Sequence, residues 1–330
     1  MNGLGDFLEW QKNLSTKIEK INARLLETVY CEQEELYSWA RYTIEAGGKR
    51  FRPLLTILAY EIGCDRPYES ILDLAAGYEL IHTASLIHDD IIDNASFRRG
   101  LPTLNVKIGV NNAIVVADYL FAKAYELGSR YGPVVSKVMA DASTKLAEGQ
   151  ILEAINLGNL SLPEETYLKI IENKTARFFA ACALGATIAA GAPENVRKNL
   201  TDFAYNLGMA FQITDDILDI VGDQKKIGKP VLTDIRHSAI TLPIIVALRN
   251  ASSAKRKVLT DALRGAQDMI EPDLLRSVFI ETNAIDYSFD MARKYTEKAM
   301  ESLRGTGKSP DLNLLMELAM IVIERIEAMS

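Results

Sequence analysis

Apolar residues recur along nearly the whole chain at the spacing of one helix face. Near the N-terminus, Leu14, Ile18, Ile21 and Leu25 fall three or four residues apart, as an amphipathic helix requires. Similar patterns run through residues 71–92, 113–127, 134–157, 167–190, 200–221 and 312–328. No alternating run bounded by hairpin signals predicts a strand. The chain is therefore predicted to be all-α.

Short breaks that contain glycine or proline separate these helices, and no Ser- or Pro-rich linker divides the chain. The β-branched run 240–248 contains Pro243, so a helix that begins near Leu242 suits it better than a strand. We expect one domain over residues 1–330, a large helix bundle. Residues 1–30 are expected to form an N-terminal helix that packs on the bundle or on a second copy of the chain.

Composition argues against several classes of protein. The net charge is −7 and the pI is about 5.3, whereas a general nucleic-acid binder needs a basic face. The three cysteines have no CxxC spacing, which indicates reduced thiols in a cytoplasmic protein. The longest apolar stretch, residues 178–192, falls short of the roughly 20 residues that span a bilayer. The first ten residues contain no evident export signal.

Two segments, residues 89–93 and 215–219, both read DDxxD and both end a long apolar helical run. The first and last aspartates of each are four residues apart, so their carboxylates lie on one helix face. Their mutual repulsion and the negative end of the helix dipole make this arrangement unfavourable for stability. Carboxylate oxygens suit Mg²⁺ that also binds substrate phosphates. The predicted metal ligands are Asp89, Asp93, Asp215 and Asp219.

Cations near the first cluster indicate phosphate binding. Residues 47–53 read GGKRFRP, which places three cations behind a glycine pair, and guanidinium groups match phosphate oxygens. Arg98 and Arg99 follow the cluster closely, so they either hold phosphate or pair with the neighbouring carboxylates. His82 lies seven residues before Asp89 on the same helix face, which suits either a packed core side chain or a ligand contact.

Further cations lie in the second half of the chain, at Lys174, followed by Thr175, and at Lys229, between Gly228 and Pro230. Together with the first basic group and the two carboxylate clusters, they are enough to hold two diphosphates. One diphosphate would be bound through metal ions and the other directly by Lys and Arg.

The order of these segments resembles that of the trans-isoprenyl (polyprenyl) diphosphate synthases. The matching segments are GGKRFRP at 47–53, HTASLIHDDIIDNASFRRG at 82–100, KT at 174–175, FQITDDILD at 211–219 and GKP at 228–230. The resemblance implies an all-α, single-domain bundle of the isoprenoid-synthase type around a deep central cavity, usually in a homodimer. It also implies a prenyltransferase that condenses isopentenyl diphosphate with an allylic diphosphate into a longer trans-polyprenyl diphosphate.

The family's site residues carry over to matching positions. The resemblance implies three Mg²⁺ ions on Asp89, Asp93 and Asp215, supported by Asp90, Asp216 and Asp219. The catalytic residues would be Asp89, Asp90, Asp93, Asp215, Lys174 and Lys229. The substrate contacts would be Lys49, Arg52, His82 and Arg99 for isopentenyl diphosphate, and Arg98, Lys174, Gln212 and Lys229 for the allylic diphosphate. Thr175 and Asp216 would be further substrate-binding residues. The hydrophobic product is expected to partition into membranes.

One segment departs from the family pattern. Many short-chain members have Gly-Lys-x-Thr-Leu-Pro after the second cluster, whereas residues 238–243 read SAITLP here. Ala239 cannot bind phosphate as that lysine does. The departure weakens the case for a farnesyl synthase and resembles some medium- and long-chain enzymes.

Product length is expected to depend on the helix before the first cluster, along which the growing chain extends. Ala84 and Ser85 are small, Ile81 is of medium size, and Tyr78 is the first large side chain. Tyr78 lies eleven residues before Asp89, roughly 16 Å along a helix axis. A Tyr78 that faces the cavity predicts about C20 to C25, and one that points away predicts about C30 to C40. The sequence favours about C25 to C40, with geranylgeranyl diphosphate (C20) as the alternative.

Two other classes of protein share part of this pattern. A class I terpene cyclase binds one diphosphate and typically has an Asn/Ser/Glu metal motif in its second half. The second DDxxD and the GGKRFRP segment argue against that class. A non-catalytic subunit of a heteromeric synthase usually lacks one or both aspartate clusters, whereas both are whole in this chain.

Overall fold

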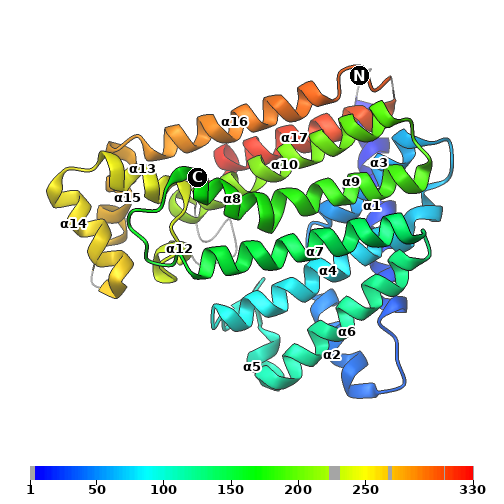
Figure 1. The fold of residues 1–330 in the computed structure, drawn as a ribbon, viewed down its shortest axis with the longest axis horizontal. Helices are drawn as coiled ribbons and strands as arrows, with labels where there is room; N and C mark the ends of the chain where they lie inside the picture. The colour runs from blue at the N-terminus through cyan, green and yellow to red at the C-terminus, as the bar shows by residue number, and fades with distance from the viewer. Residues whose placement is uncertain (1–3, 223–230, 267–269, 308, 330) are drawn as a thin grey trace. The chain divides into compact units, whose positions relative to one another are not determined.

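The computed structural model describes residues 4–222, 231–266, 270–307 and 309–329 (Figure 1). These residues are mostly helical and contain only two short strands, which confirms the predicted all-α class. By internal contacts they form two compact units. The first unit lies within residues 1–140 and 182–197, and the second within residues 141–181 and 198–330. Within the described ranges, no helix combines the length and apolarity that a bilayer crossing takes.

The first unit is built around helix α4. Its elements are α1 (Leu4–Thr28), α2 (Glu34–Glu45), α3 (Phe51–Gly63), η1 (Tyr68–Ile71), α4 (Leu72–Ile92), β1 (Phe97–Arg98), β2 (Leu101–Pro102), α5 (Leu104–Ile108), α6 (Val110–Ser129) and parts of α7 (Pro133–Ala154) and α9 (Arg177–Ala190). Every side chain of residues 74–81 is buried, as in a helix enclosed on all sides. The last turn, with the first aspartate cluster, reaches solvent.

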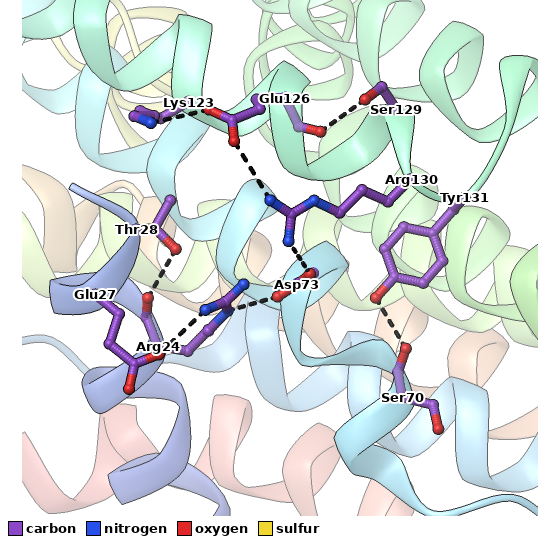
Figure 2. Close-up of polar contacts among 10 residues, drawn as sticks. All are labelled: Arg24, Glu27, Thr28, Ser70, Asp73, Lys123, Glu126, Ser129, Arg130 and Tyr131. Carbon is purple, nitrogen blue, oxygen red and sulfur yellow. Dashed lines mark hydrogen bonds and ion pairs between the residues drawn. The ribbon is translucent and has the colours of Figure 1, made fainter. Parts of the chain in front are cut away.

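Helix α6 packs more extensively against α4 than any other element of the first unit does. Gly77 of α4 permits this approach, because a Cβ atom there would lie 3.1 Å from the carbonyl oxygen of Ala124. Ion pairs at the surface join further elements to α4 (Figure 2). Asp73 accepts hydrogen bonds from Arg24 of α1 (2.5 Å) and from Arg130, which follows α6 (2.6 Å). Burial alone would raise the pKa of Asp73, but the two guanidinium groups outweigh it and leave the pKa below its usual value.

The structure contains one short hairpin, whereas the sequence predicted no strand. Strands β1 and β2 are antiparallel, with Phe97 opposite Pro102 and Arg98 opposite Leu101. Arg99 and Gly100 form the turn at φ values of 53° and 78°, and two left-handed residues are what a tight hairpin turn prefers. Two-residue strands are too short for an alternating pattern to be recognised, so the sequence did not predict the hairpin.

The second unit is also helical. Its elements are the remainders of α7 and α9, α8 (Glu164–Ile171), the π-helical turn η2 (Glu172–Ala176), α10 (Glu194–Val221) from residue 198 on, α12 (Thr233–Arg236), α13 (Leu242–Asn250), α14 (Ser253–Asp261), the π-helical turn η3 (Ala262–Ala266), α15 (Pro272–Glu281), α16 (Ala284–Ser302) and α17 (Pro310–Met329). Helix α13 begins at Leu242 with Pro243 in its first turn, as predicted. Its buried side chains share one apolar core with Ile213, Ile217 and Ile220 of α10.

Candidate active site

The first aspartate cluster occupies the exposed C-terminal turn of α4. The backbone N–H of Asp93 donates to the carbonyl of Asp89 (2.8 Å), which closes this turn and leaves the Asp93 side chain exposed. Asp89 is half-buried, whereas Asp90 is 6% exposed and points inward. The cluster therefore divides into two carboxylates that reach solvent and one that belongs to the protein interior.

Arg98 pairs with a carboxylate of the first cluster, because its Nε donates to Oδ1 of Asp90 at 2.8 Å. Burial raises the pKa of Asp90, and the neighbouring Arg98 opposes that shift only in part. The side chain of Arg98 is 37% exposed, so its guanidinium binds a carboxylate and still faces solvent.

The predicted basic group gathers around His82. Burial lowers the pKa of His82 well below its usual value, and the positive charges of Arg52, Arg99, Arg98 and Arg50 lower it further. The imidazole is therefore neutral at pH 7. Gly48 allows Arg99 to approach the 47–53 segment, because a Cβ atom on Gly48 would lie 2.9 Å from Nη2 of Arg99. Lys49 is exposed just before α3.

Arg50, the middle cation of the GGKRFRP segment, faces the interior. Its Nη1 donates to Glu79 of α4 (2.7 Å), its Nε to Asn22 of α1 (2.9 Å) and its Nη2 to the carbonyl of Ile44 of α2 (2.9 Å). The side chains of Arg50 and Glu79 are 3% and 4% exposed. Arg50 also has a φ of 53°, which a non-glycine residue seldom adopts. It therefore links three helices to the start of α3, next to Lys49 and Arg52.

The second aspartate cluster lies in the last two turns of α10. The carboxylate of Asp215 is 28% exposed and accepts a hydrogen bond from Nη2 of Arg325 of α17 (2.6 Å). Asp216 is buried and accepts hydrogen bonds from the hydroxyl of Tyr167 (2.6 Å) and from Nε2 of Gln212 (3.0 Å). Burial raises the pKa of Asp216 to about 7, against the effect of these two donors. Asp219 is 2% exposed.

The π-helical turn η2 presents Lys174 and Thr175. The sequence predicted one continuous helix over residues 167–190, but η2 interrupts it, and such turns are frequent at functional sites. Lys174 pairs with Glu153 of α7, and the hydroxyl of Thr175 donates to Oε1 of Gln212 (2.8 Å). Thr175, Gln212 and Asp216 thus form one hydrogen-bonded chain.

Two glycines make room for this π-helical turn. A Cβ atom on Gly149 of α7 would lie 2.9 Å from the backbone nitrogen of Lys174. One on Gly208 of α10 would lie 2.7 Å from Cα of Ala176. Backbone atoms cannot give way as a flexible side chain can, so both positions require glycine for this packing.

The residues expected to limit product length are all buried on α4. Tyr78, Ile81 and Ala84 are fully buried and Ser85 is 6% exposed. The hydroxyl oxygen of Tyr78 lies 2.3 Å from the point that a Cβ atom on Gly185 of α9 would occupy. Tyr78 therefore points from α4 toward α9 within the first unit.

One predicted segment lies outside the described residues, and two side chains that contact the second aspartate cluster were not predicted. Lys229, with Gly228 and Pro230, lies outside the described residues. Tyr167 and Arg325 were missed because they lie 49 and 110 residues from the aspartates that they contact, and no local pattern marks them. Ser238, at the departure from the family pattern, has a φ of 56°, where glycine is the usual residue.

Known proteins match this chain over most of its length. The family model described as polyprenyl synthetase matches residues 33–279. A geranylgeranyl diphosphate synthase of Saccharolobus solfataricus is 37% identical, over 87% of this chain and 89% of its own length. Heptaprenyl diphosphate synthase component 2 of Geobacillus stearothermophilus is 37% identical, over 94% and 97%. A crystal structure of a Caulobacter crescentus polyprenyl synthase, complexed with calcium and isoprenyl diphosphate, has a TM-score of 0.89 at 32% identity and covers 95% of this chain and 96% of that one.

Proposed function

The chain belongs to the polyprenyl synthetase family and is a prenyltransferase that makes trans-polyprenyl diphosphates, and we propose that both aspartate clusters bind Mg²⁺ for this reaction. The observation that carries the proposal is that Asp89, Asp93 and Asp215 are half-buried or exposed near the ends of α4 and α10, whereas the other aspartates of the clusters are buried. Three ions per site are part of the proposal.

The donor set fits a hard divalent cation. Mg²⁺ takes oxygen ligands, keeps several waters and commonly binds one or two carboxylates together with substrate phosphates. In the described ranges, no three His, Cys, Asp or Glu side chains converge to hold an ion by themselves. The Caulobacter relative is complexed with calcium, another cation that prefers oxygen ligands, and with isoprenyl diphosphate.

We assign the two substrates to the two basic groups. Lys49, Arg52, His82 and Arg99 would bind isopentenyl diphosphate, supported by the arginines gathered around a neutral His82. The allylic diphosphate would be bound by Arg98, Lys174, Thr175, Gln212 and Lys229. Gln212 is supported in this role by its place in the chain from Thr175 to Asp216, which fixes its amide orientation.

The reaction then needs little proton chemistry from the protein. Mg²⁺ held by the two aspartate clusters would neutralise diphosphate charge and so stabilise pyrophosphate as a leaving group. The allylic C–O bond breaks, the double bond of isopentenyl diphosphate supplies the electrons of the new C–C bond, and the departing pyrophosphate accepts the proton that is lost. The products are an allylic diphosphate one isoprene unit longer, pyrophosphate and that proton. Arg and Lys side chains hold both diphosphates, and buried apolar side chains exclude water.

Tyr78 is proposed as the residue that ends chain growth. It is the first large side chain below the small Ala84 and Ser85, and it fills the space at Gly185 on the facing helix α9. This contact favours the shorter outcome considered above, about C20 to C25, at roughly 16 Å from the level of Asp89. A product of C30 or longer would require the chain to pass Tyr78.

A homodimer is proposed as the assembly. Four exposed aliphatic side chains of the contacting helices α5 and α6 support it, because exposed apolar side chains are common at protein contact surfaces. They are Val106 (57% exposed), Val110 (46%), Ile114 (40%) and Val115 (57%). We also propose a cytoplasmic location, supported by the three free cysteines.

A second candidate is a role as one component of a heteromeric synthase. The observation in its favour is the name of the Geobacillus relative, which is component 2 of a heptaprenyl synthase. Gel filtration and a synthase assay of the purified chain alone distinguish the two. A homodimer active by itself supports the first proposal, and a chain active only with a second protein supports the other.

The central experiment measures product formation from labelled isopentenyl diphosphate and allylic primers of increasing length. Wild type should be active with Mg²⁺ and inactive with excess EDTA. Asp89→Asn and Asp215→Asn should each lower kcat by about a hundredfold or more, in line with electrostatic transition-state contacts. Lys49→Ala should mainly raise KM for isopentenyl diphosphate. Full activity of either aspartate variant, or activity in EDTA, would contradict metal binding by the clusters.

A further inference from the structure

The loop between α2 and α3, which carries Lys49, has an unusual backbone. Gly47, Gly48 and Arg50 have φ values of 83°, 145° and 53°. Such values are uncommon for a residue with a side chain, as at Arg50. Residues 47–50 belong to no helix or strand, so regular secondary structure does not fix the course of this loop. Its shape therefore depends on side chains that bind it from the neighbouring helices.

The buried guanidinium of Arg50 holds both ends of this loop together. Its Nη2 donates to the carbonyl of Ile44, in the last turn of α2 (2.9 Å). The same carbonyl accepts the backbone N–H of Gly47 (3.1 Å). The start of α3 is thus bound to the end of α2, and the loop between them is closed into a ring. The bond from Nε to Asn22 fixes this ring on α1 as well (2.9 Å).

Glu79 of α4 holds the guanidinium of Arg50 and lies close to other members of the basic group. Its bond to Nη1 of Arg50 is charge-assisted and buried, which makes it strong and specific in geometry. Glu79 precedes His82 by three residues, so the two side chains share a face of α4. Burial lowers the pKa of Arg99, and the negative charge of Glu79 is the largest effect that opposes this shift. One buried carboxylate therefore acts on both Arg50 and Arg99.

From these contacts we propose that Arg50 and Glu79 are positioning residues for the binding of isopentenyl diphosphate. They act through the loop and helix start that carry Lys49 and Arg52, and they need no contact with the substrate. Arg50 is one of three cations in the GGKRFRP segment, but its charge is already matched by a buried carboxylate. The proposal rests on the proposed function in that the basic group is assigned to isopentenyl diphosphate.

Removing both charges together separates positioning from a purely stabilising role. Loss of one partner leaves a buried charge without its counter-charge, whereas apolar replacement of both partners is often neutral for stability. Arg50→Met should therefore melt about 5 °C or more below wild type. The Arg50→Met, Glu79→Leu double variant should melt within about 3 °C of wild type. In that variant the fold is kept and only the link between the loop and α4 is lost.

The readout is the affinity for isopentenyl diphosphate, measured by steady-state kinetics and by calorimetric titration in EDTA. In the double variant, KM and Kd for isopentenyl diphosphate should rise about tenfold or more, as for displaced charge-assisted contacts. The KM for the allylic primer and kcat at saturating isopentenyl diphosphate should stay within about twofold. A loss confined to one substrate is not expected from general destabilisation.

Lys17→Met is the matched control, because it breaks another buried ion pair in the same unit. Lys17 of α1 binds Glu61 of α3 (2.8 Å), and their side chains are 3% and 19% exposed. This variant should lower the melting temperature and leave the KM for isopentenyl diphosphate within about twofold. Arg50→Lys is a second variant, which keeps a cation beside Glu79 but lacks the planar fork that binds three partners at once. It should raise this KM about threefold or more.

Two results would overturn the inference. One is a wild-type KM and Kd for isopentenyl diphosphate in the double variant, or in Arg50→Lys if the double variant does not fold. The other is an equal rise of this KM in Lys17→Met. Failure of the proposed function is distinguishable, because Lys49→Ala would then leave the KM for isopentenyl diphosphate unchanged.

Discussion

Arg325 of the C-terminal helix α17 donates a hydrogen bond of 2.6 Å to Asp215, the first aspartate of the second cluster. The guanidinium carbon lies 5.0 Å from the ring centroid of Phe211, one turn earlier in α10. The Nε and Nη1 atoms of Arg325 are buried and have no hydrogen-bond partner among the described residues. A cation thus occupies one side of a proposed Mg²⁺ ligand.

Replacing this arginine should strengthen the binding of Mg²⁺ in the absence of diphosphate. In Arg325→Met the apolar contact with Phe211 remains, while the positive charge beside Asp215 is lost. We expect the Mg²⁺ affinity without diphosphate to rise about threefold to tenfold, which corresponds to roughly 1 kcal/mol for partly exposed charges. Calorimetric titration measures it. The exposed Arg304→Met is the control, and equal or weaker Mg²⁺ binding by Arg325→Met would refute the expectation.

Tyr78→Ala should lengthen the product. Removal of the ring opens the space between α4 and Gly185 of α9, and the other expected wall residues above it are smaller. We expect a shift of at least one isoprene unit, measured by chromatography of the dephosphorylated products. Tyr78→Phe keeps the ring and should leave the product distribution as in wild type. An unchanged distribution in Tyr78→Ala would rule out a role for Tyr78 in ending growth.

Glu79→Ala should destabilise the protein strongly. The side chain belongs to a buried ion pair, and its loss leaves the Arg50 guanidinium buried without its carboxylate. Removing one partner of such a pair costs about 3–5 kcal/mol. Urea unfolding measures this loss. The control is Glu69→Ala, which breaks an exposed pair with Lys20 and should have little effect. Similar unfolding curves for the two variants would contradict the role given to Arg50.

Low pH should reduce the contribution of Asp73 to the free energy of unfolding. The folded-state pKa of this carboxyl lies below its usual value, so the stabilisation is present above the unfolded-state pKa of about 4. It is lost as pH falls through the lower folded-state pKa. The free energy of unfolding of wild type should therefore exceed that of Asp73→Asn at pH 7, and the difference should shrink below about pH 4. A difference that is constant from pH 7 to pH 3 would show that the Arg24 and Arg130 contacts contribute nothing.

The sequence alone identified the helical class, the positions of most helices and the family. These properties depend on local information. Periodicity of apolar residues predicts a helix, and Pro243 placed the start of α13 correctly. The two DDxxD segments and the GGKRFRP segment were recognisable because their residue types and spacing are themselves unusual.

Only the tertiary structure decided what each charged side chain does. Of two aspartates at equivalent places, Asp93 is exposed and Asp219 is buried against Thr233. Arg50 faces Glu79 in the interior, although Lys49 beside it is exposed. The sequence around a carboxylate or guanidinium is the same whether the group is solvated or bonded to another side chain. Its partner is set by chain segments tens of residues away, whose approach depends on packing and on glycines such as Gly149 and Gly208.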